Sequence, residues 1–282
     1  MTEDGRVVVV TGATAGIGAA AAVELAKRGD RVIPVGRDHE RLEKVADRIG
    51  EAAGGGRPTP LQADFAKLDD VRRLADDVRD RHERIDVLVN NAGLVMGERR
   101  LTDDGYETTF QVNHLAPFLL TNLLLDRLRD SAPARVITTS SDAHRNARID
   151  FDDLHGEREF AGWRAYGQSK LANVLFTREL ARRTQEDDIT ANALHPGVIR
   201  TSLNRNQGGL FALGWLVAKP FFGSPKRGAS TIVHLATSDE GGQVSGEYFT
   251  KSEKQPLGRR ATDDEAARRL WEVSKELTGL NG

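Results

Sequence analysis

A glycine-rich turn near the N-terminus constrains the fold of this 282-residue chain more than any other feature. Residues 11–18, TGATAGIG, separate an apolar run from an alanine-rich segment of helical character. Gly12 permits a tight turn, Gly16 leaves room for a phosphate, and Gly18 lets the following helix pack closely on the strand. A helix that begins here points free N–H groups at an anion. The turn therefore predicts a dinucleotide site, with a purely structural turn as the alternative. The residues expected to line it are Gly12, Thr14, Ala15, Gly16, Ile17 and Gly18.

Short apolar runs alternate with longer helical patterns along the rest of the chain. Runs rich in β-branched residues are typical of strands buried on both faces of a parallel sheet. Their alternation with helices is typical of a doubly wound α/β domain. We expect strands at residues 6–10, 31–35, 59–63, 85–89, 134–139 and 189–194, and helices at 16–28, 39–49, 68–82, 103–129 and 163–183. The prediction is a single three-layer αβα domain over residues 1–282.

Composition and charge exclude several classes of function. The net charge of -2 supplies no general attraction to nucleic acid. The chain has no cysteine, which excludes disulfides, thiolate metal sites and a cysteine nucleophile, and its histidines do not cluster as metal ligands do. It shows no signal-peptide pattern and no apolar run of the roughly 20 residues that a membrane span needs. We expect a cytoplasmic protein with no metal, no nucleic-acid partner and no membrane span.

The end of the second predicted strand indicates which dinucleotide binds. An acidic residue here normally accepts a hydrogen bond from the ribose 2′-OH of NAD, but this chain has Gly36 followed by Arg37. Without the carboxylate a 2′-phosphate is not repelled, and the guanidinium can pair with it. This favours NADP(H), the alternative being a solvated arginine at a helix start. Asp64 and Phe65, after the third strand, are expected at the adenine, although Asp64 could equally cap a helix.

Three side chains point to proton-transfer chemistry. Tyr166 and Lys170 are four residues apart on a predicted helix and so share a face. A neighbouring cation favours phenolate, which would lower the tyrosine pKa from its usual value of about 10. Such a pair alone is more often a surface feature. Ser141 adds weight because it follows the fifth strand, at the sheet edge where open α/β sheets bind ligands; Ser140 is the competing hydroxyl.

In order and spacing, these motifs resemble the short-chain dehydrogenase/reductase family, whose members have a Rossmann fold. The resemblance covers almost the whole chain and adds Asn113 and residues 195–201, HPGVIRT. A closer likeness, to the retinol dehydrogenase and WW-domain oxidoreductase branch, rests on residues 113–115, 140–144, 150–154, 169–177 and 267–274.

The resemblance implies a role for each site residue. Tyr166 is the acid/base, Lys170 holds the nicotinamide ribose and lowers the tyrosine pKa, and Ser141 orients the carbonyl oxygen. Asn113 holds a water in a proton relay. The other implied cofactor contacts are Asn90, Asn91, Ala92, Gly93, Pro196, Gly197, Val198 and Thr201.

The sequence departs from this branch in three places, which leave the substrate open. No membrane anchor or WW module is evident. Ala116-Pro117 stands where the branch often has Gly-His, and a proline within a helix predicts a kink. Residues 203–226 form an apolar, Gly- and Pro-interrupted segment. It could be a lid over an apolar substrate, or ordinary core or a protein contact.

We therefore expect an NADP(H)-dependent oxidoreductase that acts on an apolar aldehyde, ketone or secondary alcohol. Two alternatives stay open: an epimerase or dehydratase with a tightly held cofactor, and a cofactor-binding sensor without turnover. A homo-oligomer is compatible with the sequence but is not specified by it.

Overall fold

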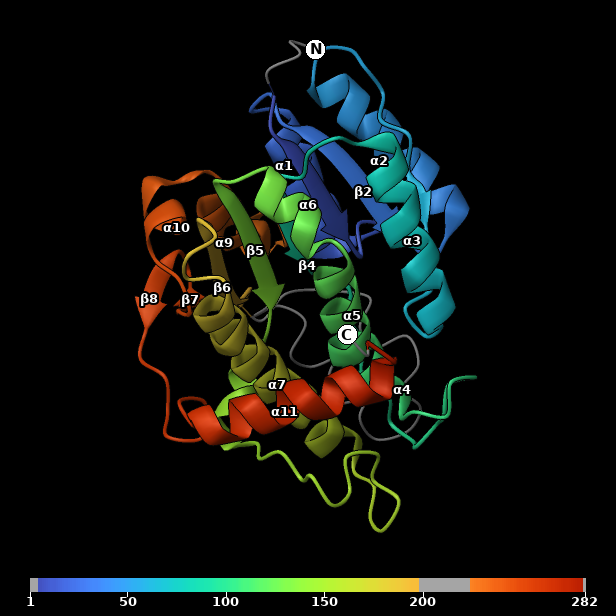
Figure 1. Ribbon diagram of the computed structural model, residues 1–282. Coiled ribbons are helices and arrows are strands. Elements are labelled where there is room, and N and C mark those ends of the chain that lie inside the picture. The colour runs from blue at the N-terminus through green and yellow to red at the C-terminus, as the bar shows by residue number, and fades with distance from the viewer. Residues whose placement is uncertain (1–4, 198–223, 281–282) are drawn as a thin grey trace.

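The computed structural model describes residues 5–197 and 224–280, and one eight-stranded sheet runs through this part of the chain (Figure 1). The strands are β1 (Val7–Thr11), β2 (Arg31–Gly36), β3 (Leu61–Gln62), β4 (Val87–Asn90), β5 (Ala134–Thr139), β6 (Ile189–His195), β7 (Tyr248–Thr250) and β8 (Glu253–Gln255). Their order is β3-β2-β1-β4-β5-β6-β7-β8, and every pair is parallel except β7–β8. The chain thus winds outward from β1 in both directions, which confirms the predicted Rossmann fold.

Helices cover both faces of the sheet because alternate strand residues point to opposite sides. Val8 and Val10 of β1 belong to one apolar core, and Val7 and Val9 belong to another. The first core packs on α1 (Gly16–Ala26), α2 (His39–Ala52) and α9 (Pro225–Thr237), which is followed by α10 (Asp239–Gln243). The helices on the second face are α3 (Leu68–Arg81), α5 (Ala116–Leu123), α6 (Leu125–Asp130), α7 (Gly162–Arg183) and α11 (Asp264–Thr278).

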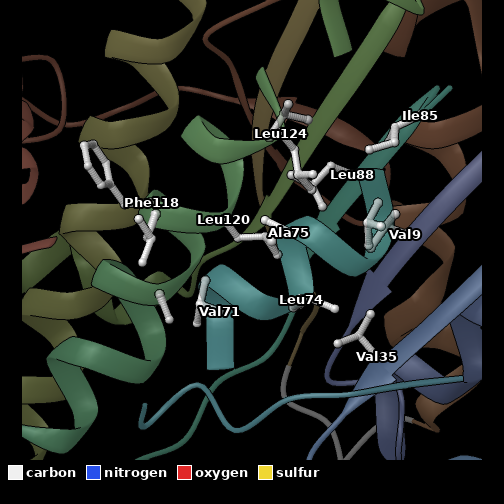
Figure 2. Packing of buried hydrophobic residues seen from close by; sticks show 14 of the residues in the cluster. Val9, Val35, Val71, Leu74, Ala75, Ile85, Leu88, Phe118, Leu120 and Leu124 are labelled. Atoms are coloured by element: carbon white, nitrogen blue, oxygen red, sulfur yellow. The ribbon is translucent and has the colours of Figure 1, made fainter. Parts of the chain in front are cut away.

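The second core brings strands and helices together as Figure 2 shows. Val9 and Val35 of the sheet face Val71 and Leu74 of α3, and Leu120 of α5 packs beside them. All are almost completely buried. Each Å² of apolar surface buried here stabilises the fold by roughly 25 cal/mol. The packed core therefore holds in place the strand ends and helices that carry the site residues.

The predicted helix at 103–129 is wrong in its start and its continuity. Residues 102–105 form a turn, and helix begins only after Glu107, whose carboxylate accepts from the N–H groups of Thr109 and Phe110 at 2.9 and 2.8 Å. The helical elements are then α4 (Thr108–Phe110), a π-helical turn η1 (Gln111–Leu115), α5 and α6. Pro117 is the second residue of α5, which continues directly from η1, so the proline lies within a continuous helical stretch. The predicted break thus coincides with a π turn, the other common cause of a bent helix.

The C-terminal edge of the sheet was not predicted. β7 and β8 form a hairpin closed by Lys251 and Ser252, both with positive φ (55° and 63°). Pro225 and Lys226, expected in the irregular segment, begin α9, where Ser224 accepts from the Arg227 N–H at 3.3 Å. The rest of that segment, residues 203–223, lies outside the described residues. Among the described helices, none combines the length and apolarity needed to cross a bilayer.

Candidate active site

The glycine-rich turn is bonded to the loop that follows β4. The Thr11 hydroxyl accepts from the backbone N–H groups of Asn91 and Ala92 at 2.9 and 3.1 Å, and Asn91 Nδ2 donates to the Thr11 carbonyl at 2.9 Å. Gly12 has φ +65°, and a Cβ there would lie 2.8 Å from the Ala92 Cα. A Cβ on Gly18 would lie 2.4 Å from the Gly12 oxygen, so Gly18 packs against the turn itself. The close contacts of this turn are therefore possible only because Gly12 and Gly18 have no side chain.

The N-terminus of α1 is open to an anion. Ala15, the residue before the helix, is extended and offers no side-chain cap, and the first turn of α1 contains no acidic residue. The first N–H groups of a helix have no intrahelical acceptor and carry the positive end of its dipole. A dinucleotide pyrophosphate fits this position by charge and by hydrogen-bonding capacity.

Gly36 and Arg37 lie at the end of β2, beside the glycine-rich turn. A Cβ on Gly36 would lie 2.4 Å from the Thr14 methyl carbon, so a carboxylate side chain does not fit unless Thr14 moves. Arg37 is exposed, and its guanidinium pairs with no other residue in the described ranges. The nearby Arg41 differs, because its Nε lies 3.1 Å from Asp38 Oδ2. Within this part of the chain, Arg37 is therefore a cation without a protein partner beside the dinucleotide turn.

Asp64 forms a local turn. Its Oδ1 accepts from the Ala66 N–H at 3.0 Å, and its own N–H donates to Asp70 Oδ2 at 3.1 Å. The residue that precedes α3 is Lys67, so Asp64 does not occupy the helix-cap position. Phe65 is buried beside it. The expected adenine contact of both residues stays a prediction.

Ser141 and Tyr166 meet at the end of β5. Ser141 precedes a short 3₁₀ helix, η2 (Asp142–Asn146), and its Oγ accepts from the Ala143 N–H at 3.3 Å. The Tyr166 hydroxyl, in the second turn of α7, lies near the Ser141 side chain, which opposes part of the rise in the Tyr166 pKa. Ser140 is directed elsewhere, because its buried hydroxyl donates to the Lys170 carbonyl at 2.7 Å. Of the two candidate serines, only Ser141 faces the phenol.

Burial sets the protonation states of Tyr166 and Lys170. Desolvation raises the pKa of Tyr166, and the Ser141 side chain offsets only part of this. Lys170 is 3% exposed, and burial lowers its pKa to about 8. The cost of burying a phenolate prevails in the net pKa of Tyr166, and the expected lowering by Lys170 stays a prediction. At neutral pH Tyr166 is a phenol that can donate a proton, and Lys170 is a cation.

Lys170 lies beside Tyr166 with its ammonium turned toward the sheet. Its Nζ is 5.6 Å from the centre of the Tyr166 ring and donates to the Thr139 carbonyl at 3.0 Å. A Cβ on Gly93 would lie 3.4 Å from this Nζ and 3.2 Å from Asn113 Oδ1. The loop after β4, the π turn and α7 thus converge on one point.

Asn113 ties these elements together through its side chain. Nδ2 donates to the Leu94 carbonyl at 2.9 Å and to Ser169 Oγ at 3.0 Å, and Oδ1 accepts from the Leu94 N–H at 2.8 Å. Both amide hydrogens are therefore in use, and the side chain has a positioning role. The water that the resemblance assigns to Asn113 stays a prediction.

Other expected cofactor residues differ in how far the structure describes them. The Asn90 amide donates to Thr121 Oγ1 on α5 at 2.8 Å and is buried there, so it does not line the turn. Pro196 and Gly197 follow β6, whereas Val198 and Thr201 lie outside the described residues. Within the described ranges, no three His, Asp or Glu side chains are grouped to hold a metal ion.

Sequence reasoning missed Trp163, which is close to the proposed proton donor. Its ring stacks on that of Tyr166, with centroids 5.5 Å apart and planes at 30°, and the residue is 64% exposed. The spacing of three residues on one predicted helix was the available signal, since such residues are neighbours on a helix surface.

The sequence profile of short chain dehydrogenases matches residues 6–209. The chain belongs to the short-chain dehydrogenase/reductase family. It is 43% identical over 276 residues to retinol dehydrogenase 12 of Mus musculus, covering 98% of this chain and 87% of that protein. It is 44% identical to a Streptomyces sp. (strain C5) protein named as a candidate daunorubicin C-13 ketoreductase, covering 98% and 93% of the two chains. These relatives confirm the predicted retinol dehydrogenase branch.

Solved structures of the family agree with this assignment. The Pseudomonas aeruginosa RhlG/NADP active-site complex superposes with a TM-score of 0.70 at 30% identity, covering 87% of this chain and 94% of that chain. The short-chain dehydrogenase/reductase described here is accordingly an oxidoreductase of a family that uses a nicotinamide cofactor.

Proposed function

We propose that this short-chain dehydrogenase/reductase uses NADP(H) to interconvert an apolar aldehyde or ketone and the corresponding alcohol. The observation that carries the proposal is the Tyr166 phenol, kept protonated by burial, with the Ser141 side chain near its hydroxyl and Lys170 beside it on the same helix. This is the arrangement that delivery of a proton to a carbonyl oxygen requires.

The preference for NADP(H) rests on Arg37 and Gly36. The Arg37 guanidinium, unpaired within the described ranges, matches a 2′-phosphate in charge and in hydrogen-bond geometry. The Thr14 methyl group closes the space that the carboxylate of an NAD-specific site would need. Thr14, Gly16 and Gly18 would hold the pyrophosphate at the start of α1, and Lys170 would hold the ribose next to the nicotinamide.

The protein's own residues carry the proton. When bound, the reduced nicotinamide would supply the hydride that a carbonyl carbon accepts as it becomes an alcohol. Tyr166 then gives its phenolic proton to the carbonyl oxygen, while Ser141 holds the oxygen in line. The Lys170 ammonium stabilises the phenolate that remains, because an opposite charge nearby favours the ionised form. Alcohol oxidation follows the same steps in reverse.

The apolar substrate class is supported by Trp163. A 64% exposed indole stacked on the proton donor offers a flat apolar surface where the reacting carbonyl must arrive. Aromatic faces bind apolar and conjugated groups with little loss of side-chain entropy. The names of the relatives, a retinol dehydrogenase and a candidate daunorubicin ketoreductase, agree with a large, conjugated carbonyl compound.

The test is reduced-cofactor consumption by the purified full-length chain. NADPH and NADH are compared at matched concentrations, each with trans-cinnamaldehyde and with acetaldehyde, and the alcohol product is quantified. We expect consumption with NADPH and trans-cinnamaldehyde, one alcohol formed per NADPH oxidised, and much slower turnover with acetaldehyde. Tight NADPH binding without consumption of NADPH or formation of alcohol would favour the alternatives, a sensor or an epimerase or dehydratase that acts on another compound.

A further inference from the structure

A buried polar chain lies behind Lys170, on the side away from Tyr166. The Thr139 carbonyl, at the end of β5, accepts from Lys170 Nζ at 3.0 Å and from Asn173 Nδ2 at 3.1 Å. Asn173 is three residues after Lys170, so both side chains leave the same face of α7. Within the described residues, the bond to Thr139 is the one hydrogen bond that Nζ makes.

His114 continues this chain from the π turn to α11. Its Nε2 lies 2.9 Å from Ser274 Oγ. Its Nδ1 and the Asn173 Oδ1 are both buried, and neither has a hydrogen-bond partner among the described residues. Burial lowers the His114 pKa to about 4, and the neighbouring Asn173 side chain opposes part of this shift, so the two unpartnered atoms belong to adjacent side chains. The imidazole is therefore neutral at any working pH and carries one N–H.

The Thr139 carbonyl can only accept hydrogen bonds, and this fixes how the side chains of Asn173 and His114 are oriented. A carbonyl cannot donate, so the Asn173 amide turns Nδ2 toward Thr139 and Oδ1 toward His114. That oxygen needs a donor, which assigns the single imidazole proton to Nδ1. Nε2 then accepts from the Ser274 hydroxyl. Ser274, His114 and Asn173 thus lead from α11 to the carbonyl that accepts from Lys170, with a His114–Asn173 hydrogen bond as the link that we infer.

Apart from these polar contacts, His114 is surrounded by aromatic side chains. Its ring packs against Phe110, Phe118 and Phe176 at centroid distances of 5.2 to 6.2 Å, and it is fully buried. Among the described residues, no charged side chain contributes to the pKa of His114 or of Lys170. α11 lies across α7 in Figure 1 and also contacts α5 and the π turn, where Ser274 meets His114.

We propose that His114 and Asn173 are positioning residues for the Lys170 ammonium, acting through the Thr139 carbonyl and anchored by Ser274 on α11. A polar side chain in an aromatic pocket is costly unless every polar atom is satisfied, and a phenylalanine would pack there without that cost. Holding the carbonyl fixes Nζ beside Tyr166, where the proposed reaction needs the cation. The effect of this hydrogen-bond network on catalysis rests on the proposed oxidoreductase function. The network itself does not depend on that proposal.

The test is the Lys170 pKa in the full-length protein, read by NMR of ¹³C-labelled lysine without any substrate or turnover. Lys170→Met assigns the resonance. His114→Phe keeps the ring volume but removes both hydrogen bonds. His114→Asn keeps an N–H near the position of Nδ1 and leaves a cavity. Phe110→Leu is the matched control, because Phe110 packs against His114 without joining the polar chain.

We expect His114→Phe to lower the Lys170 pKa by about half a unit or more, because the ammonium loses its oriented acceptor. It should also reduce kcat at least about fivefold with KM changed less than about twofold. His114→Asn should keep the wild-type Lys170 pKa yet have the lower Tm of the two. The Tm and the pKa would then rank the two variants in opposite order, which a purely structural role does not produce.

A Lys170 pKa that is unchanged or raised in His114→Phe would overturn the proposal. So would a pKa that follows Tm across His114→Phe, His114→Asn and Phe110→Leu. Because the titration needs no turnover, a chain that lacks the proposed activity would still give a clear answer on the network.

Discussion

The glycine-rich turn and the Ser141–Tyr166–Lys170 group lie at the same edge of the sheet but are built from different material. The turn consists of backbone groups brought close by missing side chains, as at Gly12 and Gly18. The Ser141–Tyr166–Lys170 group depends on side chains whose pKa values are shifted by burial. The turn, called the backbone end of the site below, should therefore lose cofactor affinity when atoms are added to it. The Ser141–Tyr166–Lys170 group, called the side-chain end, should lose activity when a functional group is removed.

Lys170→Met should change both activity and stability at the side-chain end. Loss of the cation should slow turnover on the order of 10²–10³-fold, in the range of one acid–base group. It should also stabilise the protein, because the pKa falls from 10.5 to about 8 on folding, equivalent to roughly 3 kcal/mol. This opposition of activity and stability would mark the group as functional.

The stability difference between wild type and Lys170→Met should depend on pH. Below pH 8 both the folded and unfolded wild type keep the Lys170 proton, so the cost of burying it is present in full. Between about 8 and 10.5 the folded state releases it first, so wild-type stability rises relative to Lys170→Met. Unfolding curves at several pH values measure this. A gain of similar size in Lys44→Met, an exposed control on α2, would contradict the account.

On the backbone end, Gly18→Ala should weaken NADPH binding by about 10–100-fold, the equivalent of 1–3 kcal/mol of overpacking. The added methyl group meets the Gly12 oxygen and Asn91 Nδ2 at 2.4 and 2.5 Å, so the turn must open. Gly258→Ala is the control, since a Cβ there meets no described atom within 4 Å. Fluorescence titration with NADPH compares them, and equal affinities would argue against a turn held by close packing.

Arg37→Gln should separate the two nicotinamide cofactors. We expect NADPH affinity to fall by about tenfold, the value of one hydrogen bond to a charged group, with NADH affinity unchanged. Arg41→Gln should have a smaller effect, because Arg41 already pairs with Asp38. Titration of each variant with both cofactors decides the matter. A parallel loss of NADPH and NADH would show that Arg37 supports the loop and does not read the 2′-phosphate.

The smallest effect is expected at the rim of the side-chain end. Trp163→Ala should raise KM for trans-cinnamaldehyde about three- to tenfold, in keeping with the worth of an aromatic contact, and leave kcat nearly unchanged. Leu101→Ala, at the other large hydrophobic residue exposed in the described ranges, is the control. Steady-state kinetics distinguishes them, and an equal change in both variants would remove Trp163 from the substrate site.

The sequence predicted the backbone end better than the side-chain end. A Gly-rich turn placed between a strand and a helix is a specific signal for a nucleotide site, and strand periodicity located β1 to β6. Only two residues of the expected 59–63 strand pair in the sheet, and the polar edge strand β8 carries no apolar pattern. The π turn could not be predicted because its hydrogen-bond shift depends on how α5 meets the core.

The side-chain end was predicted in its residues but not in its electrostatics. The spacing of Tyr166 and Lys170 gives their shared face, yet the direction of a pKa depends on burial, which spacing does not report. The choice between Ser140 and Ser141 required the contact of Ser140 with the Lys170 carbonyl. His114 and Ser274 are 160 residues apart, and only the packing of α11 on the π turn brings them together.

The most direct test of the central claim compares wild type with Tyr166→Phe, which removes one hydroxyl from a ring that stays packed on Trp163. NADPH binding and NADPH oxidation with trans-cinnamaldehyde are measured on the same preparations. The account expects wild-type NADPH affinity and a loss of turnover on the order of 10²–10⁴-fold. Turnover within a few-fold of wild type would contradict the assignment of Tyr166 as the proton donor.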